Sequence, residues 1–188
     1  MLLSLILSLS SAIAATYQVD ASHSRVGFAV SHMMVSTVRG EFGTVSGTVD
    51  YDPANVSATK VSAEVSVVSV ATREAKRDEH LESAEFLDAA KFPSMTFVSK
   101  SVKNPSSTGF DLVGDLTIRG VKKEVTFRVN PISKEYKDPW GNVKAGTSAT
   151  ATINRQDFGV SWNATLDGGG YVVGDDVKIE LDIELLKE

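Results

Sequence analysis

The sequence of 188 residues contains no cysteine. This absence excludes disulfide bonds, thiolate metal sites and cysteine nucleophiles. Basic residues are also in deficit, with 19 Lys and Arg against 24 Asp and Glu and a net charge of −5. Because no basic stripe is present, nucleic acid and anionic lipid surfaces are poor candidates as partners.

Motifs of the common enzyme classes are absent as well. The glycines and serine of residues 43–47 (GTVSG) have the wrong spacing for a nucleophile elbow and lie in a predicted strand. The three histidines, His23, His32 and His80, are far apart, and their spacing predicts no metal site. We therefore expect no cofactor, no metal and no catalytic residue. Two alternatives stay open: a hydrolase that uses Ser or Asp near His32, and a histidine metal-binding module.

The N-terminus has the features of a signal peptide. Residues 2–9 are apolar apart from two serines, and Ala12 and Ala14 occupy the small-residue positions of an A-x-A cleavage site. The apolar run is shorter than the roughly 20 residues that a spanning helix needs. We expect residues 1–14 to be removed and residues 15–188 to form one domain. That domain is expected in the periplasm or outside the cell, and not as an integral membrane protein.

Most of the mature sequence alternates apolar and polar residues with period two, which is typical of β-strands with one buried face. The predicted strands are Tyr17–Met33, Phe42–Tyr51, Thr59–Val70, Ser94–Val102, Phe110–Ile118, Val121–Asn130, Ala145–Arg155 and Val177–Leu186. Short turns between them predict antiparallel neighbours. Eight such strands close most simply into an all-β barrel. A two-sheet sandwich is the competing architecture.

One segment, residues 72–97, is charged and helical in pattern. Thr72 and Ser83 are placed to cap helical turns, and Pro93 forbids further helix. Apolar residues such as Phe86 give the segment a side that can pack on the barrel. The sequence therefore predicts a short helical insert between the third and fourth strands, placed as a lid over an entrance.

Small residues predict space inside the barrel. One face of the seventh predicted strand carries Ala145, Thr147, Ala149 and Ala151, and glycines interrupt two other apolar faces. Interiors pack densely, so such residues are met by large ones or leave a cavity. The alternative is that aromatic residues of the other strands fill the space: Phe28, Phe97, Phe110 and Phe127.

Several residues are candidates for contact with a ligand. His32 is in phase with Val30 and is expected to face inward, either as a core histidine or as a group that orients a ligand. The cations of the insert either form a solvated helix face or meet a polar head group. The full candidate set is Phe28, Val30, His32, Phe42, Arg73, Arg77, His80, Phe86, Phe97, Phe110, Ala149 and Trp162.

The chain resembles the YceI family, described as polyisoprenoid-binding proteins with a lipocalin-like barrel. The resemblance covers nearly all of the mature chain. It rests on the motifs HSRVGF with His32 (residues 23–32), GEF (40–42), RDxHLxSxEF (77–86), KFP (91–93), GDLT (114–117), DPWG (138–141), RxDFG (155–159) and VGDxV (173–177).

This resemblance implies an exported, cofactor-free binding protein without catalytic activity. Its barrel is expected to hold a lipid of the polyisoprenoid or quinone type, and a homodimer is left open. Thr147 departs from the family, in which an aromatic or larger apolar residue often follows Ala-Gly. If Thr147 faces inward, the cavity is expected to be wider or more polar.

Overall fold

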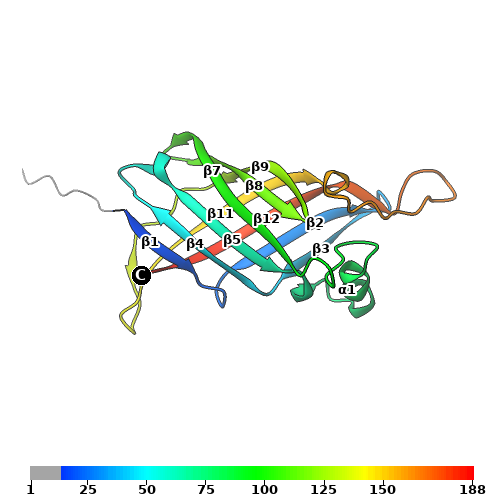
Figure 1. Ribbon diagram of the computed structural model, residues 1–188, viewed down its shortest axis with the longest axis horizontal. Coiled ribbons are helices and arrows are strands. Elements are labelled where there is room, and N and C mark those ends of the chain that lie inside the picture. Colours follow the sequence, from blue (N-terminus) through cyan, green and yellow to red (C-terminus); the bar gives the residue numbers. More distant parts are fainter. Residues whose placement is uncertain (1–13) are drawn as a thin grey trace, which may run out of the picture.

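Alternating apolar and polar residues produce a long antiparallel sheet in the computed structural model, which describes residues 14–188 (Figure 1). The signal-peptide prediction falls on residues outside this described part, apart from Ala14. The strands are β1 (Ala15–Val19), β2 (Arg25–His32), β3 (Ser36–Phe42), β4 (Val45–Tyr51), β5 (Lys60–Ser66), β6 (Val70–Ala71), β7 (Ser94–Ser106), β8 (Gly109–Ile118), β9 (Val121–Val129), β10 (Tyr136–Lys137), β11 (Val143–Asn154) and β12 (Val173–Lys187).

The sheet closes on itself because β11 pairs with β12. The closed ring runs β11-β9-β8-β7-β5-β4-β1-β12, and every pairing is antiparallel. β12 pairs with β2 through its first part and with β1 through its last part, so β1 and β2 share one position in the wall. The predicted eight-stranded barrel is therefore confirmed, and the sandwich is excluded.

Several boundaries differ from the prediction: β7 and β12 are longer than predicted, and the predicted strand Thr59–Val70 is divided among β5, η2 and β6. Two further differences lie near the N-terminus of the domain. The predicted strand Tyr17–Met33 is broken into β1 and β2 by a turn, in which the Asp20 carboxylate accepts the N–H and the hydroxyl of Ser22. The polar segment from Ser36 to Glu41 was not predicted as a strand, yet it pairs with β2 along its whole length. Pairing with a neighbour overrides weak local alternation here.

The insert between β5 and β7 contains α1 (Ala75–Glu82), and the short 3₁₀ segments η1 (Val56–Ala58), η2 (Val67–Ser69) and η3 (Arg155–Phe158) complete the secondary structure. The Ser83 hydroxyl donates to the His80 carbonyl at the C-terminal end of α1, as a capping group. In the described part of the chain, no helix is long and apolar enough to cross a membrane.

The prediction that Thr72 caps the helix is wrong, because Glu74 occupies the N-cap position. Thr72 is buried, and its N–H and hydroxyl both donate to Asp78 Oδ1, at 2.8 and 2.5 Å. Arg77 donates back to the Thr72 hydroxyl oxygen at 2.7 Å. Thr72 thus ties the start of the insert to the helix rather than starting the helix.

Gly114 allows an aromatic ring to pack directly on the backbone and does not leave a cavity at this position. The Phe97 ring lies directly over Gly114 and meets Phe127 edge-on, with ring centroids 5.1 Å apart. A Cβ at position 114 would lie 2.5 Å from the carbonyl oxygen of Val98. This part of the barrel is therefore filled by an aromatic ring, as the alternative interpretation of the small residues had it.

We expect Gly114→Ala to lower the free energy of unfolding by about 1–3 kcal/mol, because the added methyl overpacks a filled site. Gly43→Ala is the matched control, since the nearest atom to its Cβ would be the Ser69 carbonyl oxygen at 3.9 Å. Urea unfolding of both variants measures the difference. Equal stability of the two variants would show that Phe97 moves away without cost.

Candidate functional site: an apolar cavity

The barrel encloses a cavity of about 300 Å³ whose wall is almost entirely aliphatic and aromatic. This volume lies at the lower end of the range of small-molecule pockets, about 300–1,000 Å³. On β12 the residues Val177, Ile179, Leu181 and Ile183 all face this space, and each keeps some accessible surface although it points into the barrel. That surface is the wall of the cavity.

β11 confirms the prediction that small side chains line one face. Ala149 lies opposite Leu181 in the register of β11 and β12, and Thr147 lies opposite Ile183. Both Ala149 and Thr147 line the cavity. The Thr147 hydroxyl donates to the Asn130 carbonyl at 2.8 Å. Its donor is therefore used by the backbone, and the departure from the family adds little polarity to the cavity.

The insert closes one end of the cavity, where the strand wall is incomplete. β3 pairs with β6 only through Glu41 and Phe42, so the described structure gives the edge of residues 36–40 no second strand neighbour. Three side chains of the insert line the cavity: Leu81, Phe86 and Leu87. A wall closed by side chains can open without breaking a ladder of backbone hydrogen bonds.

The opposite end is closed by a second core cluster that includes Tyr17, Val49 and Leu185. The Tyr17 hydroxyl donates to Glu135 Oε1 at 2.6 Å, and Lys187 Nζ lies 2.8 Å from the same oxygen. Burial, then the hydrogen bond to Glu135 and the negative charge of that carboxylate, raise the pKa of Tyr17. The tyrosine therefore stays neutral and anchors this end, which makes the insert the better candidate for an entrance.

Seven of the twelve predicted ligand residues line the cavity: Phe28, Val30, Phe42, Phe86, Phe97, Phe110 and Ala149. The other five lie outside its lining: His32, Arg73, Arg77, His80 and Trp162. The structure therefore brings together the apolar candidates other than Trp162 and leaves the polar candidates at the rim or in the insert.

His32 shares the cavity face of β2 but lies beyond the cavity. It pairs with Val173 of β12, after the irregularity between Val173 and Val177, and with Ser36 of β3. Its side chain is partly exposed. Strand alternation predicted the face correctly, but it carries no information on depth along the barrel axis.

His80 and Trp162 form an outer layer over the lid. The His80 ring packs edge-on against both Phe86 and Trp162, with centroids 4.8 and 4.9 Å apart, and the Phe86 and Trp162 centroids are 5.1 Å apart. His80 Nε2 lies 2.5 Å from a carboxylate oxygen of Glu85. Because Phe86 also lines the cavity, this stack joins the lid to the loop after η3.

The cations of the insert differ in their contacts. Arg77 donates to the hydroxyl and the carbonyl of Thr72, both at 2.7 Å, and so holds the insert together. Arg73 is exposed and has a positive φ of 67°. Neither guanidinium contacts the cavity.

Arg155 is the functional residue that the sequence did not single out, although the motif of residues 155–159 contains it. It is the one charged side chain in the lining of the cavity within residues 14–188, and it is only 5% exposed. Its guanidinium donates to the carbonyls of Val160, Trp162, Val173 and Gly174, and to the Asp175 carboxylate. Burial lowers its pKa, against the effect of Asp175.

These bonds hold the segment after η3 against the start of β12 and use the donors of Arg155. Arginine is suited to this work because its planar guanidinium presents five N–H donors. Arg155 therefore fixes the lid end of the barrel and offers no free charge to a ligand inside.

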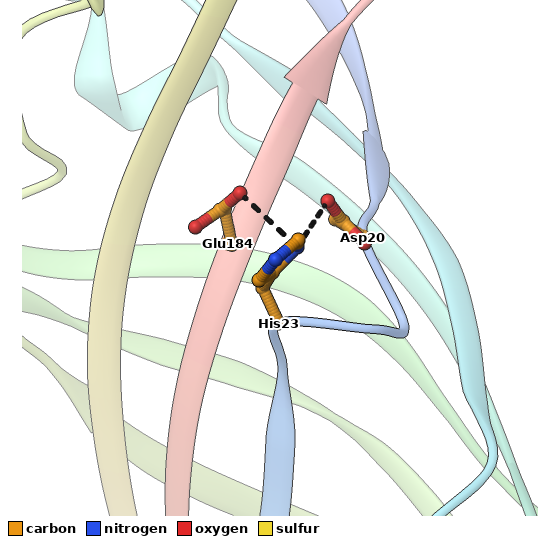
Figure 2. A group of neighbouring side chains, drawn as sticks. All are labelled: Asp20, His23 and Glu184. Atoms are coloured by element: carbon orange, nitrogen blue, oxygen red, sulfur yellow. Dashed lines mark hydrogen bonds and ion pairs between the residues drawn. The ribbon is translucent and has the colours of Figure 1, made fainter. Parts of the chain in front are cut away.

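A polar cluster on the outside of the barrel brings together Asp20, His23 and Glu184 (Figure 2). His23 Nδ1 lies 2.8 Å from Asp20 Oδ2 and 3.6 Å from Glu184 Oε1. Lys144 Nζ lies 3.0 Å from Asp20 Oδ2 and 2.6 Å from Glu184 Oε1. The Lys144 ammonium group already bridges both carboxylates and offsets one of their two negative charges, so the cluster is a clasp between the β1–β2 turn, β11 and β12.

This clasp predicts a pH dependence of stability. Hydrogen bonds from Ser22, then His23 and Lys144, lower the pKa of Asp20 in the folded chain. A lowered folded-state pKa stabilises the fold above the unfolded value of about 3.9, and that stabilisation is lost as the pH falls below it. We expect Asp20→Asn to destabilise the fold at pH 7 and the gap to wild type to narrow below about pH 4.

Thermal unfolding between pH 3 and pH 7 measures that gap. Asp167→Asn, in an exposed loop, is the control and should follow the wild-type curve. If the difference in unfolding temperature between wild type and Asp20→Asn stayed constant over this range, the charge of Asp20 would not contribute to stability.

The comparisons with known proteins agree with this geometry. The family model described as the YceI-like domain matches residues 17–185. A UPF0312 protein of Pseudomonas putida (strain F1) is 41% identical over 157 residues, which cover 82% of this chain and 81% of that protein. A UPF0312 protein of Pseudomonas savastanoi pv. phaseolicola is 40% identical with the same coverage.

Solved structures share the fold. The Campylobacter jejuni YCEI protein has a TM-score of 0.70 at 31% identity, over 84% of this chain and 90% of that one. Burkholderia cenocepacia BcnA has a TM-score of 0.77 at 23% identity, over 88% and 98%. A polyisoprenoid binding domain from Saccharophagus degradans, implicated in plant cell wall breakdown, has a TM-score of 0.62 at 14% identity, over 94% and 100%.

Proposed function

The chain belongs to the YceI family, and from this membership and its apolar interior we propose that it binds a long-chain lipid of the polyisoprenoid or quinone type inside the barrel. The observation that carries the proposal is the cavity inside the barrel, whose wall is almost entirely aliphatic and aromatic. The Saccharophagus domain, named for binding polyisoprenoid, offers a precedent on the same fold.

The energetics of such binding favour the tail over the head group. Burial of each methylene contributes up to about 0.8 kcal/mol before the ordering of the chain is counted. The hydroxyls of Thr59 and Thr147 donate to backbone carbonyls, and the guanidinium of Arg155 is fully engaged. Recognition inside the cavity therefore rests on shape and apolar area, while a polar head stays near the rim.

Binding also explains the placement of the titratable groups better than catalysis does. A hydrolase needs a nucleophile and a base within hydrogen-bond reach of each other at the substrate. His32 lies at the rim, His80 bonds Glu85 in the lid, and His23 belongs to the clasp with Asp20. In the described residues the cavity itself is lined by neither a histidine nor a carboxylate.

We expect Ala149→Phe to weaken binding of a dansyl-labelled farnesyl probe by about tenfold or more, because the ring occupies the space of the tail. Filling a real cavity costs little stability, whereas overpacking a full core costs about 1–3 kcal/mol. Thr150→Phe, on the outward face of β11, is the matched control. Fluorescence titration and thermal unfolding measure both variants, and unchanged affinity in Ala149→Phe would refute the site.

We further propose that the chain is exported, on the basis of the apolar run and the Ala12-Ile13-Ala14 site. Intact-mass measurement of the protein recovered from the periplasm of an expressing Gram-negative cell should give a chain that begins at Ala15. Replacing Ala14 with Gln should block this cleavage, because the site requires a small residue. A cytoplasmic species that retains Met1 would contradict the proposal.

A further inference from the structure

The lid end of the barrel carries an exposed apolar turn. Met33, Met34 and Val35 join β2 to β3 and are 40%, 68% and 82% exposed. Tyr171, in the loop between η3 and β12, is 61% exposed. The β2–β3 turn and this loop project from the end of the barrel that carries α1 (Figure 1). We call these four residues the apolar tip.

The two parts of the apolar tip are in direct contact. The Met33 N–H donates to the Val172 carbonyl at 2.8 Å, next to Tyr171. The end of the Met34 side chain lies against Gly170. The apolar tip is therefore one surface made by two loops, and not a set of isolated exposed residues.

The backbone of the turn makes its methionines costly. Met33 and Met34 have φ values of 52° and 59°. Two consecutive positive φ values are typical of a hairpin turn that favours Asn-Gly, because a side chain with a Cβ is disfavoured in that region. The stability of the hairpin therefore does not explain why methionine occupies both positions. Contact of the exposed methionine side chains with a partner outside the barrel does explain it.

The apolar tip lies at the rim of the cavity. Val30 and Val173 line the cavity, and His32, directly before the turn, pairs with Val173. Only Ser31 and His32 separate Val30 from Met33, and only Val172 separates Val173 from Tyr171. The apolar surface inside the barrel therefore lies close to the apolar tip outside it. A chain that leaves the cavity at this end emerges beside the tip.

We propose that the apolar tip inserts into the surface of a lipid bilayer and holds the lid end of the barrel against it. This proposal rests on the proposed function, because a long isoprenoid or quinone is stored in a bilayer and its carrier must reach it there. Met and Val side chains gain by burial among acyl chains, and tyrosine suits the membrane–water interface.

The charges near the tip fit this partner. Residues 29–40, which form the hairpin end, contain no carboxylate and include Arg39, whereas the other loop carries the exposed Asp167 and is followed by Asp175 and Asp176 at the start of β12. The chain as a whole carries a charge of −5, so an anionic surface would repel the rest of the molecule. Apolar insertion into a neutral bilayer is therefore the form of contact that the structure favours.

Flotation of the full chain with phosphatidylcholine vesicles tests the proposal, with Met33→Asn/Met34→Gly as the variant. Asn-Gly is the preferred pair for this backbone, so the variant should be as stable as wild type or more stable while its vesicle partitioning falls about tenfold or more. Trp140→Ser, which removes an aromatic side chain that is 84% exposed in the β10–β11 hairpin, is the control and should float as wild type.

The proposal is overturned if wild type does not float, if the Asn-Gly variant floats equally well, or if Trp140→Ser alone abolishes flotation. Sedimentation of wild type as a dimer that the Asn-Gly variant splits would overturn it too, because the tip would then bind a second copy. Titration of the protein with the dansyl-labelled farnesyl probe in the absence of vesicles separates the membrane proposal from the proposal of lipid binding in the cavity. If the Asn-Gly variant loses flotation but still binds the probe, the tip acts on the membrane independently of the cavity. If wild type does not bind the probe, the proposed lipid binding in the cavity is refuted, whatever the flotation result.

Discussion

The structure depends on the pairing of β12 along both of its edges. This strand of 15 residues pairs with β11 on one side and with β2 and then β1 on the other. Closure through β12 removes the free edges of the main ring, which an open sheet of this size would expose to other chains. The same strand presents Val177, Ile179, Leu181 and Ile183 to the cavity. One element therefore closes the barrel and forms much of its apolar wall.

A cavity weakens the middle of a barrel, so stability must come from its wall and its ends. Atoms around an unfilled space lose packing contacts that a dense core would provide. Here the Tyr17–Leu185 cluster packs one end, and Arg155 binds four carbonyls at the other. The Asp20–Lys144 clasp adds a connection across the outside of the wall. Stiff ends keep the wall from collapsing onto the space that a ligand would fill.

The sequence predicted the barrel and most of its apolar lining because both follow from a local rule. Alternation assigns Phe28, Val30 and Ala149 to one face, and the closed ring turns that face inward. Depth along the barrel axis and the partners of polar groups follow from tertiary contacts. For this reason His32 was placed too deep, and the role of Arg155 was not foreseen. The depth of His32 depends on the irregular start of β12, and the role of Arg155 depends on the loop after η3; no local pattern specifies either.

The distribution of polar contacts separates a rigid part of the barrel from a part that can open. Around most of the ring, neighbouring strands are joined by continuous backbone ladders, which open only with loss of several hydrogen bonds. The edge of β3 residues 36–40 has no second strand partner in the described structure, and Leu81, Phe86 and Leu87 of the insert line the cavity by side-chain contacts alone. Apolar contacts of this kind can be exchanged for equivalent contacts with a lipid tail at little cost. On the proposed function, a lipid tail that enters here would replace the contacts of the side chains that it displaces, and the strand ring would not need to change.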